Sequence, residues 1–360
     1  MQPLVSTSDY DSGDGSSIYV RDASGVWTLA YTVNDGSPGR NQTQIKVVPS
    51  APNTAIGINV DTAHIYLSSN GGKAWAFNNF GNGLLAEQET DAIDEDGNLY
   101  SPFGSNYPLH KSTDYGNTSK VFFIPSAEQG GFGGGTWASD GVIAQGGTNA
   151  FPGPYQSYLW WLDYSGNLLF TTIGADESMA QANQYGLVVG KNGSQLIVTI
   201  ATQSVAHPTG TITVFDTTLL PGNPQLRSVT PFGVELVLDA CPVTHTVLLA
   251  HTVDPTSSYA GSIWRSTDQG ATWTRVVGPT ANLAKDPTAT YIARSIAVDL
   301  ANPPADCWVA SATPHAFHST DQGTTWSQES VGSPPDPYFF SITMVGPNLT
   351  LSSRASALPL

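Results

Sequence analysis

Short apolar segments, separated by turn residues, recur along the whole chain, and none has the 3.6-residue period of an amphipathic helix. The last clear group is "RSIAVDL", "DCWVASA", "HAFHSTD" and "TTWSQES", between residues 294 and 330. The group before it is "VELVLDA", "TVLLAHT", "SIWRSTD" and "TWTRVV", between residues 234 and 277. Alternating apolar and polar residues bounded by Gly, Asp and Asn predict β-strands. We therefore expect an all-β protein built from groups of four strands.

The two groups contain the same turn, S-T-D-Q-G-x-T-W, at residues 266–273 and 319–326. Looser copies occur at 68–75 and 112–119, and marginal copies elsewhere. The central Asp or Asn recurs in steps of 44 to 53 residues, at Asp22, Asn70, Asp114, Asp163, Asp216, Asp268 and Asp321. A repeat of about 50 residues with four short strands is typical of propeller blades. The sequence therefore predicts one domain over residues 1–360, a single seven-bladed β-propeller with four-stranded antiparallel blades.

The two ends of the chain predict how the propeller closes. "YFFSITMVG" and "NLTLSSR", near the C-terminus, resemble the first two strands of a blade. "SSIYVRD" and "VWTLAY", near the N-terminus, resemble the last two. Together they would form one shared blade and remove the open edges. In an alternative division, "PLVSTSD" at the N-terminus supplies the second strand.

The residue types in the turn indicate a structural role for the repeated Asp. Gly permits a left-handed backbone in a tight hairpin. The Asp side chain can accept hydrogen bonds from N–H groups of its own turn, and the Trp that begins the outer strand can pack over it. We therefore assign structural roles to Asn70, Gly72, Trp75, Asp114, Gly116, Asp268, Gly270, Trp273, Asp321, Gly323 and Trp326. A second recurring set, at the expected ends of first strands, is interpreted as hairpin turns: Asp94, Asp239 and Asp299.

These turns resemble the Asp-box, or BNR repeat, of the sialidase-like β-propeller superfamily, which includes sialidases, xyloglucanases, sortilin-type receptors and the photosystem II assembly factor. The resemblance implies a propeller fold and matches no specific member. Sialidases need three arginines and an Arg-Ile-Pro stretch, and the sequence lacks that stretch. It also lacks the second propeller of xyloglucanases, the Cys-rich module of sortilin-type receptors and a basic patch like that of the assembly factor. The resemblance therefore implies no functional residue.

Composition narrows the classes of partner. The net charge is −16, with only 13 Lys and Arg among 360 residues, which argues against nucleic-acid binding. The chain has no apolar run of about 20 residues, so membrane insertion is not expected. Few charges and many Ser, Thr, Gly and Asn predict an extracellular or virion location, and "MQPLVSTSDYDSGDG" shows no signal peptide. Either a signal has been removed or the chain is part of a virus particle. Cys241 and Cys307 lie in apolar strand-like segments, which favours buried thiols over a disulfide.

Long, dissimilar loops are expected on the face opposite the repeated turns, at residues 127–136, 149–158, 174–186, 203–210 and 253–261. Their aromatic residues predict a stacking surface for a sugar or a protein, consisting of Phe132, Phe151, Tyr155, Tyr158, Tyr185 and Tyr259. In the alternative interpretation these side chains only cap the propeller channel.

Three functions compete. The favoured hypothesis is a non-enzymatic virion protein, such as a phage tail or head-surface component, that binds another virion protein or a neutral host-surface glycan. A secreted glycan-active enzyme would need two carboxyl groups about 5–10 Å apart, for which the candidates are Glu128, Asp176, Glu177 and Asp254. The third hypothesis is a bacterial surface adhesin.

We expect no cofactor and no metal. His315 and His318 are three residues apart on a strand and therefore point to opposite faces, which makes a poor metal pair. Asp9, Asp11 and Asp14 depart from the spacing of a calcium loop.

Overall fold

The computed structural model describes residues 2–9, 16–33, 41–48, 50–59, 62, 64–79, 92–94, 96–102, 108–124, 136–139, 142–148, 157–173, 186–192, 195–202, 211–216, 225–231, 236–244, 246–253, 261–277, 295–299, 306–310, 315–330, 339–345 and 350–352. Every regular element in these ranges is a β-strand, and the paired strands run antiparallel. The expectation of an all-β protein with antiparallel sheets is confirmed.

The N-terminal half of the chain forms three sheets. The first has the order β3-β2-β1-β4-β5-β6-β7, with β28 also beside β1. Its strands are β1 (Gln2–Asp9), β2 (Ser16–Arg21), β3 (Trp27–Val33), β4 (Asn41–Val47), β5 (Ala55–Asn59), β6 (Ile65–Ser68), β7 (Ala76–Asn79) and β28 (Phe339–Val345). The second consists of β8 (Ala92–Ile93), β9 (Leu99–Pro102), β10 (Leu109–Ser112) and β11 (Lys120–Phe123). The third consists of β12 (Thr136–Ser139), β13 (Val142–Thr148), β14 (Ser157–Asp163) and β15 (Leu168–Ile173).

The C-terminal half adds three more sheets, each again in chain order. One consists of β16 (Gly186–Asn192), β17 (Gln195–Thr202), β18 (Thr211–Asp216) and β19 (Gln225–Pro231). The next consists of β20 (Leu236–Pro242), β21 (Leu248–Val253), β22 (Gly261–Ser266) and β23 (Thr274–Val277). The last consists of β24 (Ser295–Asp299), β25 (Asp306–Ala310), β26 (His315–Ser319), β27 (Ser327–Ser330) and β29 (Thr350–Ser352), which pairs with β24.

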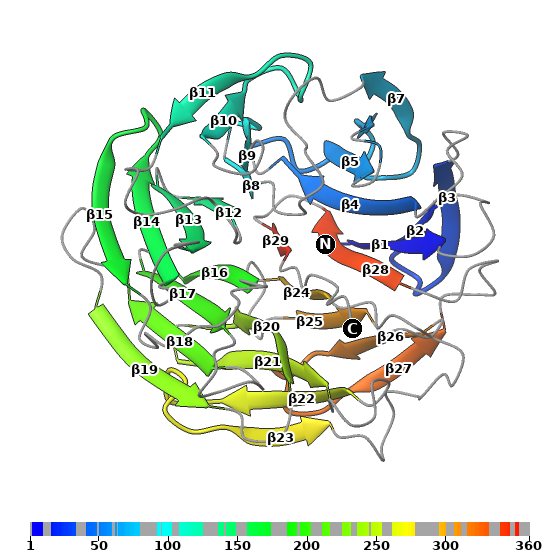
Figure 1. The fold of residues 1–360 in the computed structure, drawn as a ribbon. Coiled ribbons are helices and arrows are strands. Elements are labelled where there is room, and N and C mark those ends of the chain that lie inside the picture. The colour runs from blue at the N-terminus through cyan, green and yellow to red at the C-terminus, as the bar shows by residue number, and fades with distance from the viewer. Residues whose placement is uncertain are drawn as a thin grey trace.

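Figure 1 shows these sheets arranged around a common centre. Strands such as β8, β12, β16, β20 and β24 lie toward the middle, and β3, β7, β11, β15, β19, β23 and β27 lie at the perimeter. A radial arrangement of antiparallel sheets is the architecture of a β-propeller.

Apolar clusters connect neighbouring sheets. One cluster joins Ile56 and Ile65 of the first sheet to Leu99 of β9. Another joins Tyr100 of β9 to Trp160 of β14. All five residues of β5 are buried, because this strand is covered on both faces instead of only one. The core is therefore distributed between sheets, and each sheet depends on its neighbours for burial.

The two ends of the chain meet in the first sheet. β1 pairs with β28 from Gln2 opposite Val345 to Thr7 opposite Phe339, and its other edge pairs with β2. The segment "PLVSTSD" was one of two alternatives for the second strand of the shared blade, and it lies beside β28. The other alternative, "NLTLSSR", contributes β29, which pairs with β24. Only residues 10–15 separate β1 from β2, so this hairpin forms at a small entropic cost.

One prediction about the first-strand carboxylates is wrong. Asp239 does not end a strand, because β20 continues through it to Pro242. The ladder with β21 shifts register between Val237 and Asp239, and this bulge accommodates the polar residue while the apolar segment continues to pair. Asp94 does lie in a turn after β8, and Asp299 is the last residue of β24.

Candidate functional site

The repeated Asp side chains are hydrogen-bonded within their own turns. In the turn between β26 and β27, Asp321 Oδ1 accepts from the N–H of Thr325 at 2.8 Å, and Oδ2 accepts from the Thr325 hydroxyl at 2.7 Å. Ser319 Oγ donates to Asp321 Oδ1 and accepts from the N–H of Gly323, both at 2.8 Å. The side-chain oxygens of Ser319 and Asp321 are thus bonded within the same turn.

The same pattern recurs in three further turns. We call all four of them serine turns, after the Ser that lies two residues before the Asp or Asn. The turns at Asp114 and Asp268 repeat all four bonds. At Asn70 the amide oxygen replaces the carboxylate and accepts from Ser68 Oγ and from the N–H of Ala74. The backbone is left-handed at the residue after the Asp in three of these turns, with φ values of 54° at Tyr115, 59° at Gln269 and 58° at Gln322.

Trp side chains close three of the serine turns. The indole N–H of Trp75 donates to the carbonyl oxygen of Gly72 at 2.8 Å, and Trp273 and Trp326 bond the carbonyls of Gly270 and Gly323 at 3.0 Å. Ser119 occupies this position in the turn at Asp114. The ring therefore covers the turn and also uses its polar atom there.

A second turn type uses Asp without the preceding Ser. It occurs at Asp22, Asp94 and Asp163, where Oδ1 accepts from the N–H groups two and four residues later. The Gly three residues after each Asp has a positive φ of 84° to 90°. This explains why the copies at Asp22 and Asp163 look irregular as sequences, since they form a different turn.

The hydrogen bonds keep the turn carboxylates ionised. Burial acts to raise the pKa of Asp268, but bonds from Thr272 and Ser266 outweigh it and hold the pKa below its ordinary value. The same balance lowers the pKa of Asp114, Asp163 and Asp321. A general acid needs a raised pKa near the working pH, so these carboxylates suit turn stabilisation instead of proton transfer.

Cationic side chains link successive sheets at one recurring position. Arg265, directly before the serine turn at Asp268, donates through Nε to the carbonyl oxygen of Gln322 in the next sheet at 2.8 Å. Lys111 holds the corresponding place before the turn at Asp114, and its Nζ lies 3.5 Å from the carbonyl oxygen of Tyr164 in the next sheet. The acceptor in each case is the residue directly after the turn Asp, which is Asp321 or Asp163. The turns at Asp321 and Asp163 are thus each anchored to the preceding sheet.

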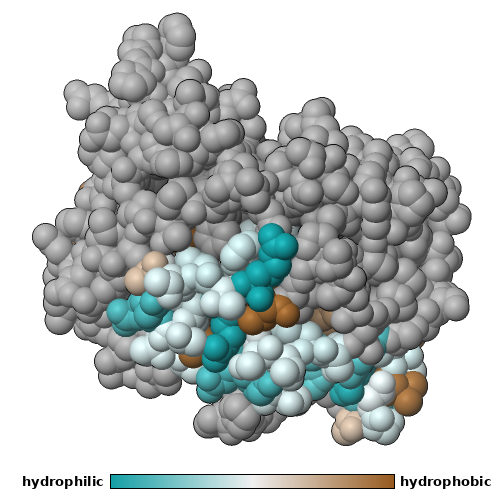
Figure 2. Space-filling model, turned by 90° about the horizontal axis from the view of Figure 1, so that it is seen from below, coloured by the Kyte–Doolittle hydropathy of each residue, from teal (hydrophilic) through white to brown (hydrophobic). Residues whose placement is uncertain are grey.

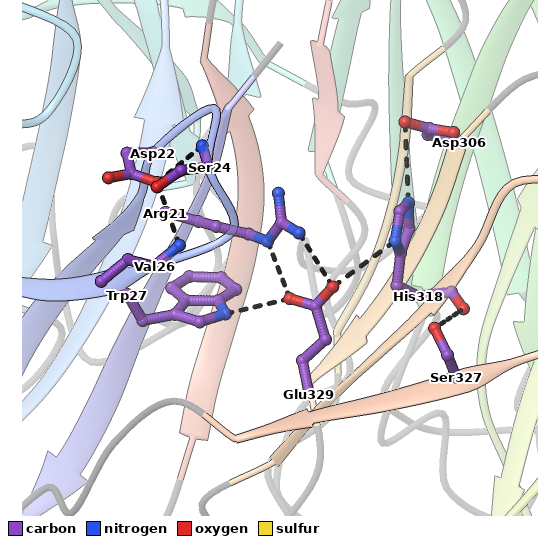
Figure 3. A network of polar contacts seen from close by, with 9 residues as sticks. All are labelled: Arg21, Asp22, Ser24, Val26, Trp27, Asp306, His318, Ser327 and Glu329. Carbon is purple, nitrogen blue, oxygen red and sulfur yellow. Dashed lines mark hydrogen bonds and ion pairs between the residues drawn. The ribbon is translucent and has the colours of Figure 1, made fainter.

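A network of polar contacts lies where the N-terminal and C-terminal sheets meet (Figure 3). We call it the junction cluster, and it consists of Arg21, Trp27, Asp306, Trp308, His318 and Glu329. Arg21 donates to both oxygens of Glu329, at 2.7 and 2.9 Å, and Trp27 Nε1 lies 3.3 Å from the same carboxylate. Arg21 and Trp27 belong to β2 and β3 of the first sheet, and Trp308 belongs to β25 of the last sheet. The cluster therefore exists only in the folded chain.

His318 stands between the two carboxylates of this cluster. Its Nδ1 lies 3.7 Å from Glu329 Oε1, and its Nε2 lies 3.6 Å from Asp306 Oδ2. The imidazole stacks on the Trp308 ring, with centroids 3.9 Å apart and an angle of 11° between the planes. Arg21 Cζ lies 5.1 Å from the centroid of the same indole. Burial is the largest influence on His318 and lowers its pKa, although both carboxylates act in the opposite direction.

The sequence-predicted binding and catalytic candidates lie outside the described residues. This applies to the aromatic residues Phe132, Phe151, Tyr155, Tyr185 and Tyr259 and to the carboxylates Glu128, Asp176, Glu177 and Asp254. Tyr158 lies in β14, opposite Ile173 of β15, and only its backbone is described. These assignments therefore stay predictions.

Sequence reasoning missed the junction cluster. Arg21 and Glu329 are 308 positions apart, and no motif connects them. The only available signal was the expectation that the two ends share a blade, which would have brought "YVRD" close to "WSQES". From the sequence, His318 was considered only as part of a poor metal pair with His315.

The described surface offers only scattered apolar side chains. Figure 2 shows mostly hydrophilic and intermediate colours on the described part of its face, with small brown patches between them. The exposed large apolar residues lie on or beside the perimeter strands β3, β7, β11 and β15: Val26, Leu29, Phe77, Val121, Ile124 and Leu168. Within the ranges given above, no three His, Cys, Asp or Glu side chains are grouped to hold a metal ion. No helix that could span a membrane occurs among the same residues.

Comparison with known proteins shows similarity of structure alone. No family model and no curated sequence matches this chain. Among solved structures, "YCF48 bound to D1 peptide" is similar with a TM-score of 0.47 and 12% identity, covering 91% of this chain and 98% of that chain. The GH74 enzyme of Niastella koreensis has a TM-score of 0.45 and 15% identity, covering 93% and 67%. YCF48 from Cyanidioschyzon merolae has a TM-score of 0.46 and 11% identity, covering 88% and 96%.

Proposed function

We propose that this chain is a non-enzymatic binding protein of a virus particle, a structural or host-recognition component such as a phage tail or head-surface protein. In this role it binds another virion protein or a neutral host-surface glycan. The repeated turns serve as scaffold, and the dissimilar loops between residues 127 and 261 form the ligand surface.

The non-enzymatic part of the proposal rests on one observation: the recurring carboxylates are hydrogen-bonded within their own turns. In the turns at Asp22, Asp94, Asp114, Asp163, Asp268 and Asp321, the side chain accepts backbone N–H groups of its own turn. A carboxylate that is bonded in this way supports the fold and is not free to attack or protonate a substrate. The low number of Lys and Arg argues for a neutral partner.

We further propose that the scaffold is a closed seven-bladed propeller over residues 1–360. The eight-stranded first sheet corresponds to two blades that are linked because Ser8 and Asp9 of β1 also pair with β4. With the five other sheets this division gives seven blades. The pairing of β1 with both β28 and β2 supports one blade that is shared by the two ends.

The aromatic residues Phe132, Phe151, Tyr155, Tyr158, Tyr185 and Tyr259 are proposed as the contact surface. Aromatic rings provide a large contact area at a small entropic cost. Serine turns are short and nearly identical, so they offer little shape by which to distinguish partners. Loops that differ between repeats can carry specificity on a rigid scaffold.

Two experiments test this function. Mass spectrometry of purified virus particles from the source should detect the chain, and its consistent absence would rule out the virion role. Tyr155→Ala combined with Tyr259→Ala should weaken binding to isolated particles or to a neutral glycan array, and should change stability by less than about 1 kcal/mol. Leu29→Ala is the matched control, because it removes an exposed apolar side chain from a perimeter strand.

The enzymatic alternative is tested separately. The variant with Glu128→Gln, Asp176→Asn, Glu177→Gln and Asp254→Asn would lose any hydrolysis of neutral polysaccharides that the unmodified chain shows, if these carboxyls are catalytic. Hydrolysis by the unmodified chain that is lost in this variant would overturn the non-enzymatic proposal. A surface adhesin would be indicated by binding to host cells together with absence from particles.

A further inference from the structure

The junction cluster contains one histidine, His318, beside a carboxylate that is already paired with an arginine. Arg21 already neutralises Glu329 through two short hydrogen bonds, and His318 lies on the other side of the same carboxylate. We propose that this cluster is an acid-released latch. When His318 takes up a proton, the contact of β2 and β3 with β26 and β27 loosens, and the adjacent pair β1–β28 opens before the rest of the fold.

The surroundings of His318 favour its neutral form. The charged groups that face it are Asp306 from β25, Glu329 from β27 and Arg21 from β2. His318 Nε2 is buried and has no hydrogen-bond partner among the described residues. Its nearest acceptor, Asp306 Oδ2, is 3.6 Å away on a side chain that is 39% exposed. A second proton on the ring would therefore be desolvated without a close acceptor, which is unfavourable.

The balance of influences on His318 gives the direction of the pH effect. Burial and Arg21 lower its pKa, Asp306 and Glu329 raise it, and the net result is a lowered pKa. The closed junction therefore binds the proton more weakly than the open one. The latch has its full strength above the ordinary histidine pKa of about 6.5. It loses strength as the pH falls below that value toward the pKa of the closed state.

The junction is the natural place for such an opening. Elsewhere, neighbouring sheets follow one another in the chain, and the polypeptide itself holds them together. At the junction, by contrast, the segments in contact are about 300 residues apart: β1 pairs with β28 within the first sheet, and the junction cluster joins β2 and β3 to the last sheet. Because no short loop connects these segments, they can separate without unfolding the sheets between them.

Hydrogen exchange at single-peptide resolution tests the proposal on the full chain. Protection factors, corrected for the intrinsic pH dependence of exchange, are measured at about pH 7.5 and about pH 5, on either side of the ordinary histidine pKa. Protection of β1 and β28 should fall in acid by up to about tenfold for each unit by which the His318 pKa is lowered. Protection of β21 and β22 should stay unchanged. Equal loss of protection in all four strands would overturn the latch.

One variant and one control assign the effect to His318. His318→Gln should abolish the acid-induced loss of protection in β1 and β28. His110→Gln should preserve this loss of protection. Burial also lowers the pKa of His110, but this residue lies in β10, away from the junction. Loss of protection that persists in His318→Gln would refute the proposal.

Asp306→Asn provides a second test that does not remove the histidine. Asp306 raises the pKa of His318, so its neutralisation should lower that pKa further and move the opening to lower pH. The His318 Cε1–H resonance, followed by NMR, should titrate in step with the exchange. A shift to higher pH, or no shift, would contradict the mechanism even if His318→Gln failed to fold.

Discussion

The guanidinium of Arg21 donates to both carboxylate oxygens of Glu329, at 2.7 and 2.9 Å, although the two residues are 308 positions apart. Both side chains are 21% exposed, so the pair is partly shielded from water. Bidentate geometry is the strongest form of an Arg–carboxylate contact. The pair therefore joins the first and last sheets by a directed interaction, whereas the β1–β28 ladder joins the two ends of the chain within the first sheet.

Removing one partner of this pair should destabilise the protein. Arg21→Met leaves Glu329 partly buried without its cation, and we expect a loss of about 1–3 kcal/mol in the free energy of unfolding. Urea denaturation of Arg21→Met, Glu329→Gln and the double variant should give a coupling energy of about 1 kcal/mol. Arg275→Met is the control, since this exposed Arg lies over the Trp264 ring at 5.0 Å and should cost only about 0.5 kcal/mol. Additive single-variant effects would show that the pair contributes nothing.

The serine turn at Asp321 should require an acceptor but not a charge. Asp321→Ala removes the acceptor for Thr325 N–H and Ser319 Oγ and should cost about 1–2 kcal/mol. Asp321→Asn should cost clearly less, because Asn70 accepts the equivalent bonds in its own turn. Thermal and urea unfolding measure both variants. A folded Asp321→Ala protein that no longer binds its partner would contradict the structural role of this residue.

Gly323 should not tolerate a side chain. Its φ is +78°, and an added Cβ would lie 2.5 Å from Leu249 Cδ2 in the preceding sheet. Gly323→Ala should therefore lose about 2–4 kcal/mol, from backbone strain and from the steric conflict. Gly25→Ala separates these two causes, because Gly25 has φ +90° and its Cβ would meet the Arg21 guanidinium only at the longer distance of 3.1 Å. If both variants lose the same free energy, the contact with Leu249 is unimportant.

Acid should weaken the turns in a narrow range of pH. The pKa values of Asp114, Asp163, Asp268 and Asp321 are lowered in the folded protein, so the unfolded chain binds these protons more strongly. Their contribution to stability is complete above the ordinary Asp pKa of about 3.9 and is lost as the pH falls below it. Urea midpoints from about pH 6 to about pH 2.5 should show this decline. Asp268→Asn should make it shallower, and an unchanged slope would speak against the assignment.

Local order in this protein was largely predictable from the sequence. The alternation of apolar and polar residues and the repeated S-T-D-Q-G-x-T-W turn predicted antiparallel strands near residues 262–277 and 315–330, although β23 and β27 are only four residues long. These features follow from interactions within a few residues, such as Asp321 with Thr325 and Trp326 with Gly323. The left-handed Gly270 and Gly323 were predictable for the same reason, because a tight turn imposes that backbone geometry.

The division of the repeats into two turn types was not predicted. Asp22, Asp94 and Asp163 lack the preceding Ser, and the single-letter pattern made two of them look like weak copies of one motif. The bulge at Asp239 was missed because the polar residue was interpreted as a strand end, whereas pairing with β21 carries β20 on to Pro242.

By itself, the sequence determined where most strands lie and how the serine turns fold, since both depend on residues that are close in the chain. Only the tertiary structure decided which distant segments meet. The choice of β1 over β29 as the neighbour of β28, the salt bridge from Arg21 to Glu329 and the stacking of His318 on Trp308 all join parts far apart in sequence. Such contacts arise when the sheets pack around a common centre, and no local pattern encodes which surfaces that packing brings together.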